Sequence, residues 1–244
     1  MEGEIRMRIQ LHKWEGNTSG WSAWSLAHLG FATWRPTREG VLERVPGKFD
    51  TYTAWLRQHG QEVEEDDASN LEVVEEIAGD EVAFREDFLP AEDAEIARCE
   101  ILLACSRRSL IETVSPLSDE ALDRDPPYER FDEWAWWRTV RQIVAHIALC
   151  EVGYYLPSIG WRVPLDPEDL RDAPWREQLI RSREETLRFL EAMRTSKDRV
   201  RLTQGQEAWS LRKVLRRLVW HERVHWKSIT RILRDWEGTR RPEL

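Results

Sequence analysis

Hydrophobic and polar residues change their spacing along this chain near residue 90. In residues 4–14 apolar and polar side chains alternate, and this period of two is typical of a half-buried strand. From residue 90 onward apolar residues recur every three or four positions over four long segments, which indicates amphipathic helices. The pattern predicts two domains, a small α+β unit over residues 1–85 and an all-α unit over residues 90–238.

The first domain is predicted to contain three strands and one helix. Thr37 is suited to cap the start of the helix and Gly60 its end, and Pro46-Gly47 predicts a break within it. The order is strand, strand, helix, strand, at residues 4–14, 21–29, 37–60 and 71–78.

The second domain is predicted to be a four-helix bundle, the economical way to bury four apolar stripes. A connection of about fifteen residues with three prolines, 160–174, allows a crossover between the second and third helices. A short extended segment is expected at 200–203 and a frayed polar tail at 237–244. The four helices are placed at residues 91–115, 133–156, 175–194 and 209–236.

Composition narrows the class of protein. The 244 residues are 33% charged and contain no run of 18 apolar residues, so no membrane span is expected. The N-terminus carries acids and lacks the apolar segment of a secretory signal. Three cysteines (Cys99, Cys105 and Cys150) suit a reducing compartment better than a disulfide framework, and we expect a cytoplasmic protein.

The net charge of −9 is unevenly distributed, because residues 62–100 hold sixteen acids and two bases. The last helix is basic, which raises the question of nucleic-acid binding. No groove-reading motif accompanies the bases, so we interpret them as a solvated or salt-bridged face and do not expect a nucleic-acid partner. These residues are Arg212, Lys213, Arg216, Arg217, Arg223, Lys227, Arg231 and Arg234.

Histidines on the second and fourth helices suggest a metal site. His221 and His225 are four residues apart, so a helix places them on one face, one turn from each other. His146 lies in a similarly apolar helical segment. If the two helices meet, His146, His221 and His225 form a three-histidine site for zinc, nickel or iron(II). His12, His28 and His59 have unrelated spacings and are interpreted as ordinary surface or core residues.

Three neighbours of these histidines are further candidates. Cys150 lies one turn beyond His146, where it would reach the metal or a substrate, although a buried inert thiol is the more common case. Glu151 and Glu222 would either orient the ligand histidines or pair with arginines, and we favour pairing. The fourteen tryptophans are expected mostly in the core, with one or two at the pocket; those flanking the site are Trp134, Trp136, Trp137, Trp220 and Trp226.

The Ala-His-Ile-Ala segment at 145–148, together with residues 209–225, resembles the DinB/YfiT-like superfamily over about residues 91–236. The resemblance implies a four-helix bundle in which His146, His221 and His225 bind a divalent metal. It also implies, for some members, transfer of a low-molecular-weight thiol such as bacillithiol or mycothiol to a small electrophile. Arg217 departs from the pattern, because some members carry a smaller residue or another histidine there.

Two other interpretations remain open. His221-Glu222-Arg223-Val224-His225 also fits the zinc-hydrolase pattern His-Glu-x-x-His, with Glu222 as base. This interpretation is the weaker one, because such helices usually carry an apolar residue where Arg223 stands and because the acids after His225 that could serve as a third ligand are Asp235, Glu237 and Glu243. Alternatively the chain is a non-enzymatic metal-binding or regulatory protein. The first strand, its Gly-rich turn, the segment from Gly30 to Gly40 and the helix ending at Gly60, about 60 residues in all, are similar to HicB-type small domains. This resemblance would make the first domain a binding and dimerisation unit, and a homodimer is possible on either interpretation.

Overall fold

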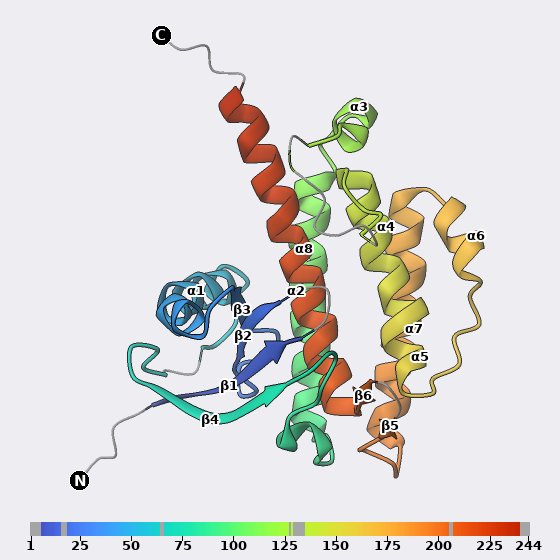
Figure 1. Cartoon of the computed structure of the whole chain (residues 1–244). Coiled ribbons are helices and arrows are strands. Elements are labelled where there is room, and N and C mark those ends of the chain that lie inside the picture. Colours follow the sequence, from blue (N-terminus) through green and yellow to red (C-terminus); the bar gives the residue numbers. More distant parts are fainter. Residues whose placement is uncertain are drawn as a thin grey trace. The chain divides into compact units, whose positions relative to one another are not determined.

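A computed structural model describes residues 6–15, 19–63, 66–126, 128, 135–204 and 207–239 (Figure 1). The chain divides into two compact units. The first combines Met1–Pro90 with Val200–Arg216, and the second combines Ala91–Arg199 with Arg217–Leu244. Residues 200–216, expected in the helical domain, therefore group with the sheet, and the domain boundaries at 85 and 90 stay a prediction.

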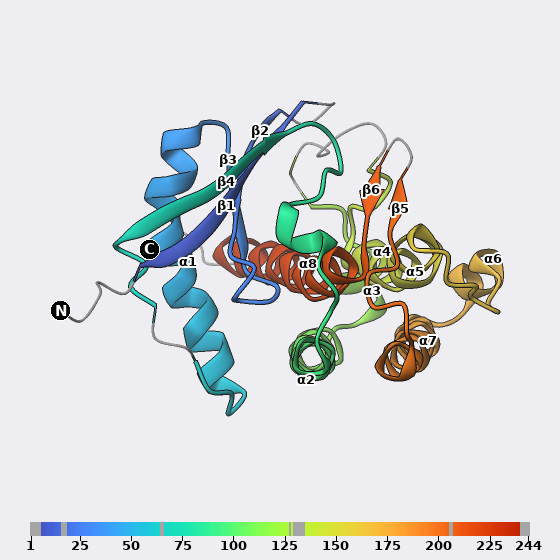
Figure 2. The same cartoon turned by 90° about the horizontal axis from the view of Figure 1, so that it is seen from below.

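A four-stranded mixed sheet forms the centre of the first unit, in the order β3-β2-β1-β4. The pairs β1–β2 and β2–β3 are antiparallel, whereas β1 and β4 are parallel, with Met7 opposite Leu71. Parallel pairing needs a crossover, which the helix α1 provides on one side of the sheet (Figure 2). The strands are β1 Met7–Trp14, β2 Gly20–Trp24, β3 Ala32–Arg35 and β4 Leu71–Ala78.

The strand expected at 21–29 is shorter than the sequence pattern suggested. It ends at Trp24, and a further strand, β3, follows a turn. Gly30 adopts a φ of +81°, and the amide of Phe31 donates to the carbonyl of His28, which reverses the chain. Leu26, Ala27 and Leu29 belong to this turn, where Leu26 and Leu29 are partly buried and Ala27 is exposed, so their apolar character does not mark a strand.

The helix α1 (Arg38–Gln58) begins and ends at the expected caps, but the predicted break is wrong. The Thr37 hydroxyl accepts a hydrogen bond from the Gly40 amide, and Gly60, with a φ of +68°, follows the last turn. The helix continues through Pro46. Buried side chains on both sides of the proline, including Val41 and Phe49, hold the helix on the sheet and outweigh the lost backbone hydrogen bond.

Two basic residues of the segment 200–216 are buried in the first unit. Arg216 donates to both carboxylate oxygens of Asp87, at 2.9 and 2.7 Å, and its guanidinium lies 4.7 Å from the Trp24 ring centroid. The Lys213 amine donates to the Ala208 carbonyl at 2.7 Å and is 1% exposed. Lys213 and Arg216 are therefore salt-bridged, as one form of the interpretation had it, but they are not solvated. Arg217 and Arg223 are buried as well, in the second unit, whereas Arg231 and Arg234 are exposed.

Four long helical segments make up most of the second unit. Figure 2 looks along α2 and α7, which pack side by side. The four segments together bury an apolar core that includes Leu110, Ile147, Leu179 and Ile232. The long segments are α2 (Asp93–Val114), α4 (Val140–Cys150) continued by η2 (Glu151–Tyr155) and α5 (Leu156–Ser158), α7 (Trp175–Thr195) and α8 (Leu211–Thr239).

Smaller elements differ from the expectation. The second bundle helix begins at Val140 rather than near 133, because Thr139 caps it and Gln142 reaches back to the Thr139 amide. The last helix begins at Leu211, after a hairpin of β5 (Thr203–Gln204) and β6 (Ala208–Trp209). Short helices form within expected loops: η1 (Arg85–Phe88), α3 (Asp119–Asp123) and α6 (Pro167–Asp172). Residues 240–244 of the expected tail lie outside the described residues.

Among the described helices, none is both long enough and apolar enough to cross a membrane.

Candidate metal centre

The second unit brings the three predicted histidines together. His146 lies on α4, and His221 and His225 lie one turn apart on α8. The Nε2 atoms of His146 and His221 are 3.0 Å apart. The ring centroid of His225 lies 4.7 Å from that of His146 and 4.4 Å from that of His221.

Cys150 belongs to the same cluster. Its sulfur lies 3.5 Å from Nδ1 and 3.7 Å from Nε2 of His146. In the described part of the chain, His146, Cys150 and His221 form the group whose ligand atoms all lie within 4.8 Å of one another. His225 borders this group through its ring contacts.

Aromatic side chains cover the histidines. Trp137 stacks on His146 with ring centroids 3.5 Å apart and an interplanar angle of 18°. Trp136 meets His146 edge-on at 6.0 Å, and Tyr155 meets His221 edge-on at 5.3 Å. Trp226 instead donates its indole N–H to the Thr113 hydroxyl at 2.9 Å, and Trp134 lies outside the described residues.

The three imidazoles are neutral at pH 7. Burial, and then the charge of His225, lowers the pKa of His146 to about 2. Burial lowers the pKa of His225 to about 4, and burial with the neighbouring histidines lowers that of His221 well below its ordinary value. A neutral imidazole keeps one nitrogen lone pair, which is the form that binds a metal.

Burial also raises the pKa of the Cys150 thiol to about 12, while the charge of Arg217 acts in the opposite direction. Arg217 is itself buried, and its guanidinium lies 4.7 Å from the Trp220 ring centroid. The residue that departs from the expected family pattern is therefore a cation near the cluster. It acts electrostatically on both Cys150 and His221.

The donor atoms fit a divalent ion. Two nitrogens each about 2.05 Å from one tetrahedral ion are separated by about 3.3 Å. The Nε2 atoms of His146 and His221, at 3.0 Å, need only a shift of a few tenths of an ångström to meet this value. Neutral imidazoles and a thiol are ligands that zinc and similar ions prefer.

A profile of the DinB superfamily matches residues 102–229, more than half of the chain. The chain belongs to the DinB superfamily. Among solved structures it is similar to YfiT from Bacillus subtilis, which is described as a probable metal-dependent hydrolase with an unusual four-helix bundle topology. The identity is 22%, the alignment covers 60% of this chain and 90% of YfiT, and the TM-score is 0.44. No curated protein matches the sequence.

The helix that carries His146 in this DinB chain changes its winding directly after Cys150. Residues Glu151–Tyr155 form a π-helical turn, in which the Leu156 amide donates to the Glu151 carbonyl. Such turns insert one extra residue into an α-helix and are frequent at functional sites. Here Cys150 contacts His146, while the next residue, Glu151, is 3% exposed and forms ion pairs with Arg107 and Arg183.

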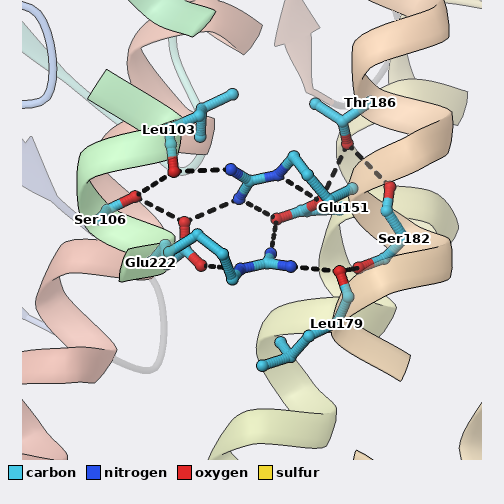
Figure 3. Close-up of polar contacts among 9 residues, drawn as sticks. Leu103, Ser106, Glu151, Leu179, Ser182, Thr186 and Glu222 are labelled. Carbon is cyan, nitrogen blue, oxygen red and sulfur yellow. Dashed lines mark hydrogen bonds and ion pairs between the residues drawn. The ribbon is translucent and has the colours of Figure 1, made fainter. Parts of the chain in front are cut away.

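Four buried charges form a layer next to the DinB histidines, with one residue from each long helical segment (Figure 3). We call Arg107, Glu151, Arg183 and Glu222 the charge layer. Arg183 donates to Glu151 at 2.8 Å and to Glu222 at 2.7 Å. Arg107 also donates to both carboxylates, at 2.7 Å to Glu151.

The charge layer is neutral overall and richly hydrogen-bonded. Ser106 donates to Glu222 at 2.6 Å and Thr186 to Glu151 at 2.9 Å. Burial alone would raise the pKa of Glu222, but Arg107 and Arg183 lower it to about 2. Glu222 therefore stays ionised and bound to cations, and it lacks the free, basic carboxylate that a His-Glu-x-x-His hydrolase needs.

Arg107 and Arg183 are not among the residues predicted from the sequence, although a signal for them exists. Each interrupts an apolar stripe of its helix: Arg107 lies between Leu103 and Leu110, and Arg183 between Leu179 and Leu190. A charged residue at the centre of a core-facing stripe is rarely fully buried unless it is paired. Two such arginines on separate helices, with Glu151 and Glu222 on the other two, would have indicated the layer.

Proposed function

We propose that this chain is a divalent-metal-dependent enzyme of the DinB type, with His146, His221 and His225 as metal ligands. The observation that carries the proposal is the meeting of three neutral imidazoles from two helices, with the Nε2 atoms of His146 and His221 3.0 Å apart. Membership of the DinB superfamily supports it. Zinc, nickel and iron(II) all suit this donor set.

The surrounding side chains set the conditions for chemistry. A bound divalent ion would act as a Lewis acid and lower the pKa of a thiol or water beside it. Trp137 covers one face of His146 and excludes water from it. Arg217 adds a fixed positive charge near Cys150 and His221, which favours an anionic sulfur or oxygen at the site.

The reaction that we propose is transfer of a low-molecular-weight thiol, such as bacillithiol or mycothiol, to a small electrophile. The thiol loses its proton to solvent, its sulfur forms a bond to the electrophilic carbon, and the leaving group departs with the bonding electron pair. A small substrate suits a site walled by Trp136, Trp137 and Tyr155.

Metal analysis tests the proposal first. The purified chain is expected to hold one divalent ion, and His146→Ala and His221→Ala are expected to lose it. His59→Ala is the matched control, because His59 bonds to the Trp55 carbonyl within α1, in the other unit. A chain that binds no divalent metal at neutral pH would overturn the proposal.

Activity is tested next by incubating the metal-loaded chain with bacillithiol or mycothiol and a chromogenic aryl halide. We expect thiol conjugation that His221→Ala abolishes. Hydrolysis of amide or ester substrates without thiol use would instead favour a metal-dependent hydrolase, the activity suggested for YfiT.

A second candidate function is regulatory. In this alternative the bundle is a scaffold and the sheet of the first unit, proposed as HicB-like, mediates an interaction or a homodimer. The observation in its favour is that residues 200–216 group with the first unit, where Arg216 donates to Asp87 of η1 and its guanidinium lies over the ring of Trp24 in β2. Unchanged thermal stability after metal removal, together with dimers in sedimentation analysis, would favour it.

A further inference from the structure

Cys150 occupies a position that the three-histidine site does not explain. It ends α4 one turn after His146, and its sulfur is nearly equidistant from the two ring nitrogens of that histidine, at 3.5 and 3.7 Å. Cys99 and Cys105, the other cysteines, are buried on α2.

We propose that Cys150 is a fourth protein ligand of the ion, so that a thiolate completes a site of three imidazoles. This inference rests on the proposed function, because it needs an ion held by the histidines. It changes the character of that site from an open three-nitrogen centre to one closed by sulfur.

The distances support one shared ion. In a tetrahedral zinc site with Zn–S of about 2.3 Å and Zn–N of about 2.05 Å, sulfur and nitrogen are about 3.5 Å apart. The Cys150 sulfur lies 3.7 Å from Nε2 of His146, and that same nitrogen lies 3.0 Å from Nε2 of His221. Both separations therefore agree with one tetrahedral ion within a few tenths of an ångström.

The alternative is an inert thiol that only contacts His146. In that case nothing would require the Cys150 sulfur to lie near His221. Yet the ligand atoms of Cys150, His146 and His221 all lie within 4.8 Å of one another, so the sulfur lies close to a ring nitrogen of the second histidine as well. An ion at this point would also remove the thiol proton, since a coordinated thiol is deprotonated.

Coordination by sulfur has two chemical consequences. A soft thiolate favours zinc and other thiophilic ions over magnesium or manganese. With Cys150 as a fourth protein ligand the ion would have no open position, so the thiolate is the ligand that a thiol substrate would resemble chemically.

Cobalt(II) provides the test, because a thiolate bound to cobalt gives a charge-transfer absorption in the near ultraviolet, separate from the visible ligand-field bands. The wild-type chain loaded with one cobalt is expected to show both. Cys150→Ser and Cys150→Ala are expected to keep the visible bands, lose the near-ultraviolet band and bind zinc at least roughly tenfold more weakly. Cys105→Ser is the matched control and should retain the visible bands, the near-ultraviolet band and the zinc affinity of the wild type.

The outcomes separate the two proposals. Visible cobalt bands without a charge-transfer band in the wild type would overturn the Cys150 assignment and leave the histidine site intact. A charge-transfer band that survives in Cys150→Ala would also overturn it. No cobalt binding would overturn the proposed function itself.

Discussion

The Nε2 atoms of His146 and His221 lie 3.0 Å apart, although 75 positions separate the two residues in the sequence. Two imidazole nitrogens at this distance share at most one proton, so one nitrogen accepts while the other donates, or both face a cation. Burial keeps both rings neutral. The pair is thus poised to exchange one shared proton for a metal ion.

The metal-free chain should lose stability as the pH falls from 7 toward 4. The folded-state pKa values of His146 and His225 lie at about 2 and 4, well below that of a free histidine, so the unfolded chain binds protons that the folded chain excludes. The contribution of each histidine to the free energy of unfolding is fully present above pH 6.5. Below pH 6.5 it decreases by about 1.4 kcal/mol for each pH unit.

Urea unfolding of chelator-treated protein at several pH values measures this slope. His146→Asn should flatten it. A slope that is the same in wild type and His146→Asn would contradict the prediction.

Trp137→Ala should weaken metal binding by roughly tenfold, in the range seen when groups that orient metal ligands are removed. The indole lies parallel to the His146 ring at 3.5 Å and fixes its orientation. Trp136→Ala is the control, because Trp136 is 40% exposed and touches His146 only edge-on. Calorimetric zinc titration provides the comparison, and equal affinities in the two variants would argue against an orienting role.

Arg183→Met should destabilise the fold by about 3 to 5 kcal/mol, because it leaves a buried net negative charge on Glu151 and Glu222. Arg181→Met, on the same helix, should cost less than about 0.5 kcal/mol, since Arg181 makes only a partly exposed pair with Glu177 at 3.4 Å. The double variant Arg183→Met/Glu151→Gln restores neutrality and should recover part of the loss in chemical denaturation. If the double variant recovers no stability, the loss in Arg183→Met comes from packing and not from charge.

Glu222→Gln separates the charge layer from the zinc-hydrolase interpretation. If Glu222 were a catalytic base, the variant would keep its stability and lose activity. We expect instead a loss of stability at pH 7. The pKa of Glu222 is lowered to about 2, so its contribution, on the order of 3 kcal/mol, is present above pH 4.5 and disappears toward pH 2. The difference between the melting temperatures at pH 7 and at pH 3 should therefore be smaller in the variant than in the wild type.

Asp87→Ala should destabilise the first unit by about 3 to 5 kcal/mol. Asp87 is 1% exposed and accepts two hydrogen bonds from Arg216. The variant therefore leaves the buried guanidinium of Arg216 without this carboxylate. Glu76→Ala is the control, because its pair with Arg38 is exposed. Hydrogen exchange resolved by mass spectrometry would locate the loss in β1–β4.

The bundle and its histidines were predictable from the sequence because both depend on helical periodicity. His221 and His225 lie one turn apart in any α-helix, and the apolar stripes of α2 and α7 are unambiguous. His146 followed as the partner because it lies in a similarly apolar helical segment, and the DinB resemblance implied the same three histidines.

The remaining features depend on contacts that local pattern does not encode. Trp137 precedes the helix that begins at Val140 and folds back onto His146. The buried state of Lys213 and Arg216 depends on Glu81 and Asp87, more than 120 positions earlier in the chain. The sequence pattern does not distinguish a solvated from a salt-bridged basic residue on an amphipathic helix, because the acidic partners are far away in the sequence.

The charge layer has a consequence for how the bundle can evolve. Each of its four members sits on a different helix, and each carboxylate is shared by both guanidiniums. If a helix were rotated about its axis or shifted by one residue, a charge would be left in the interior without its ion-pair partner. The layer therefore favours one rotation of each helix about its axis. We expect the four positions to covary among relatives, exchanged together or not at all. Sequence drift elsewhere in the bundle would then leave the angle between the histidine-bearing helices unchanged.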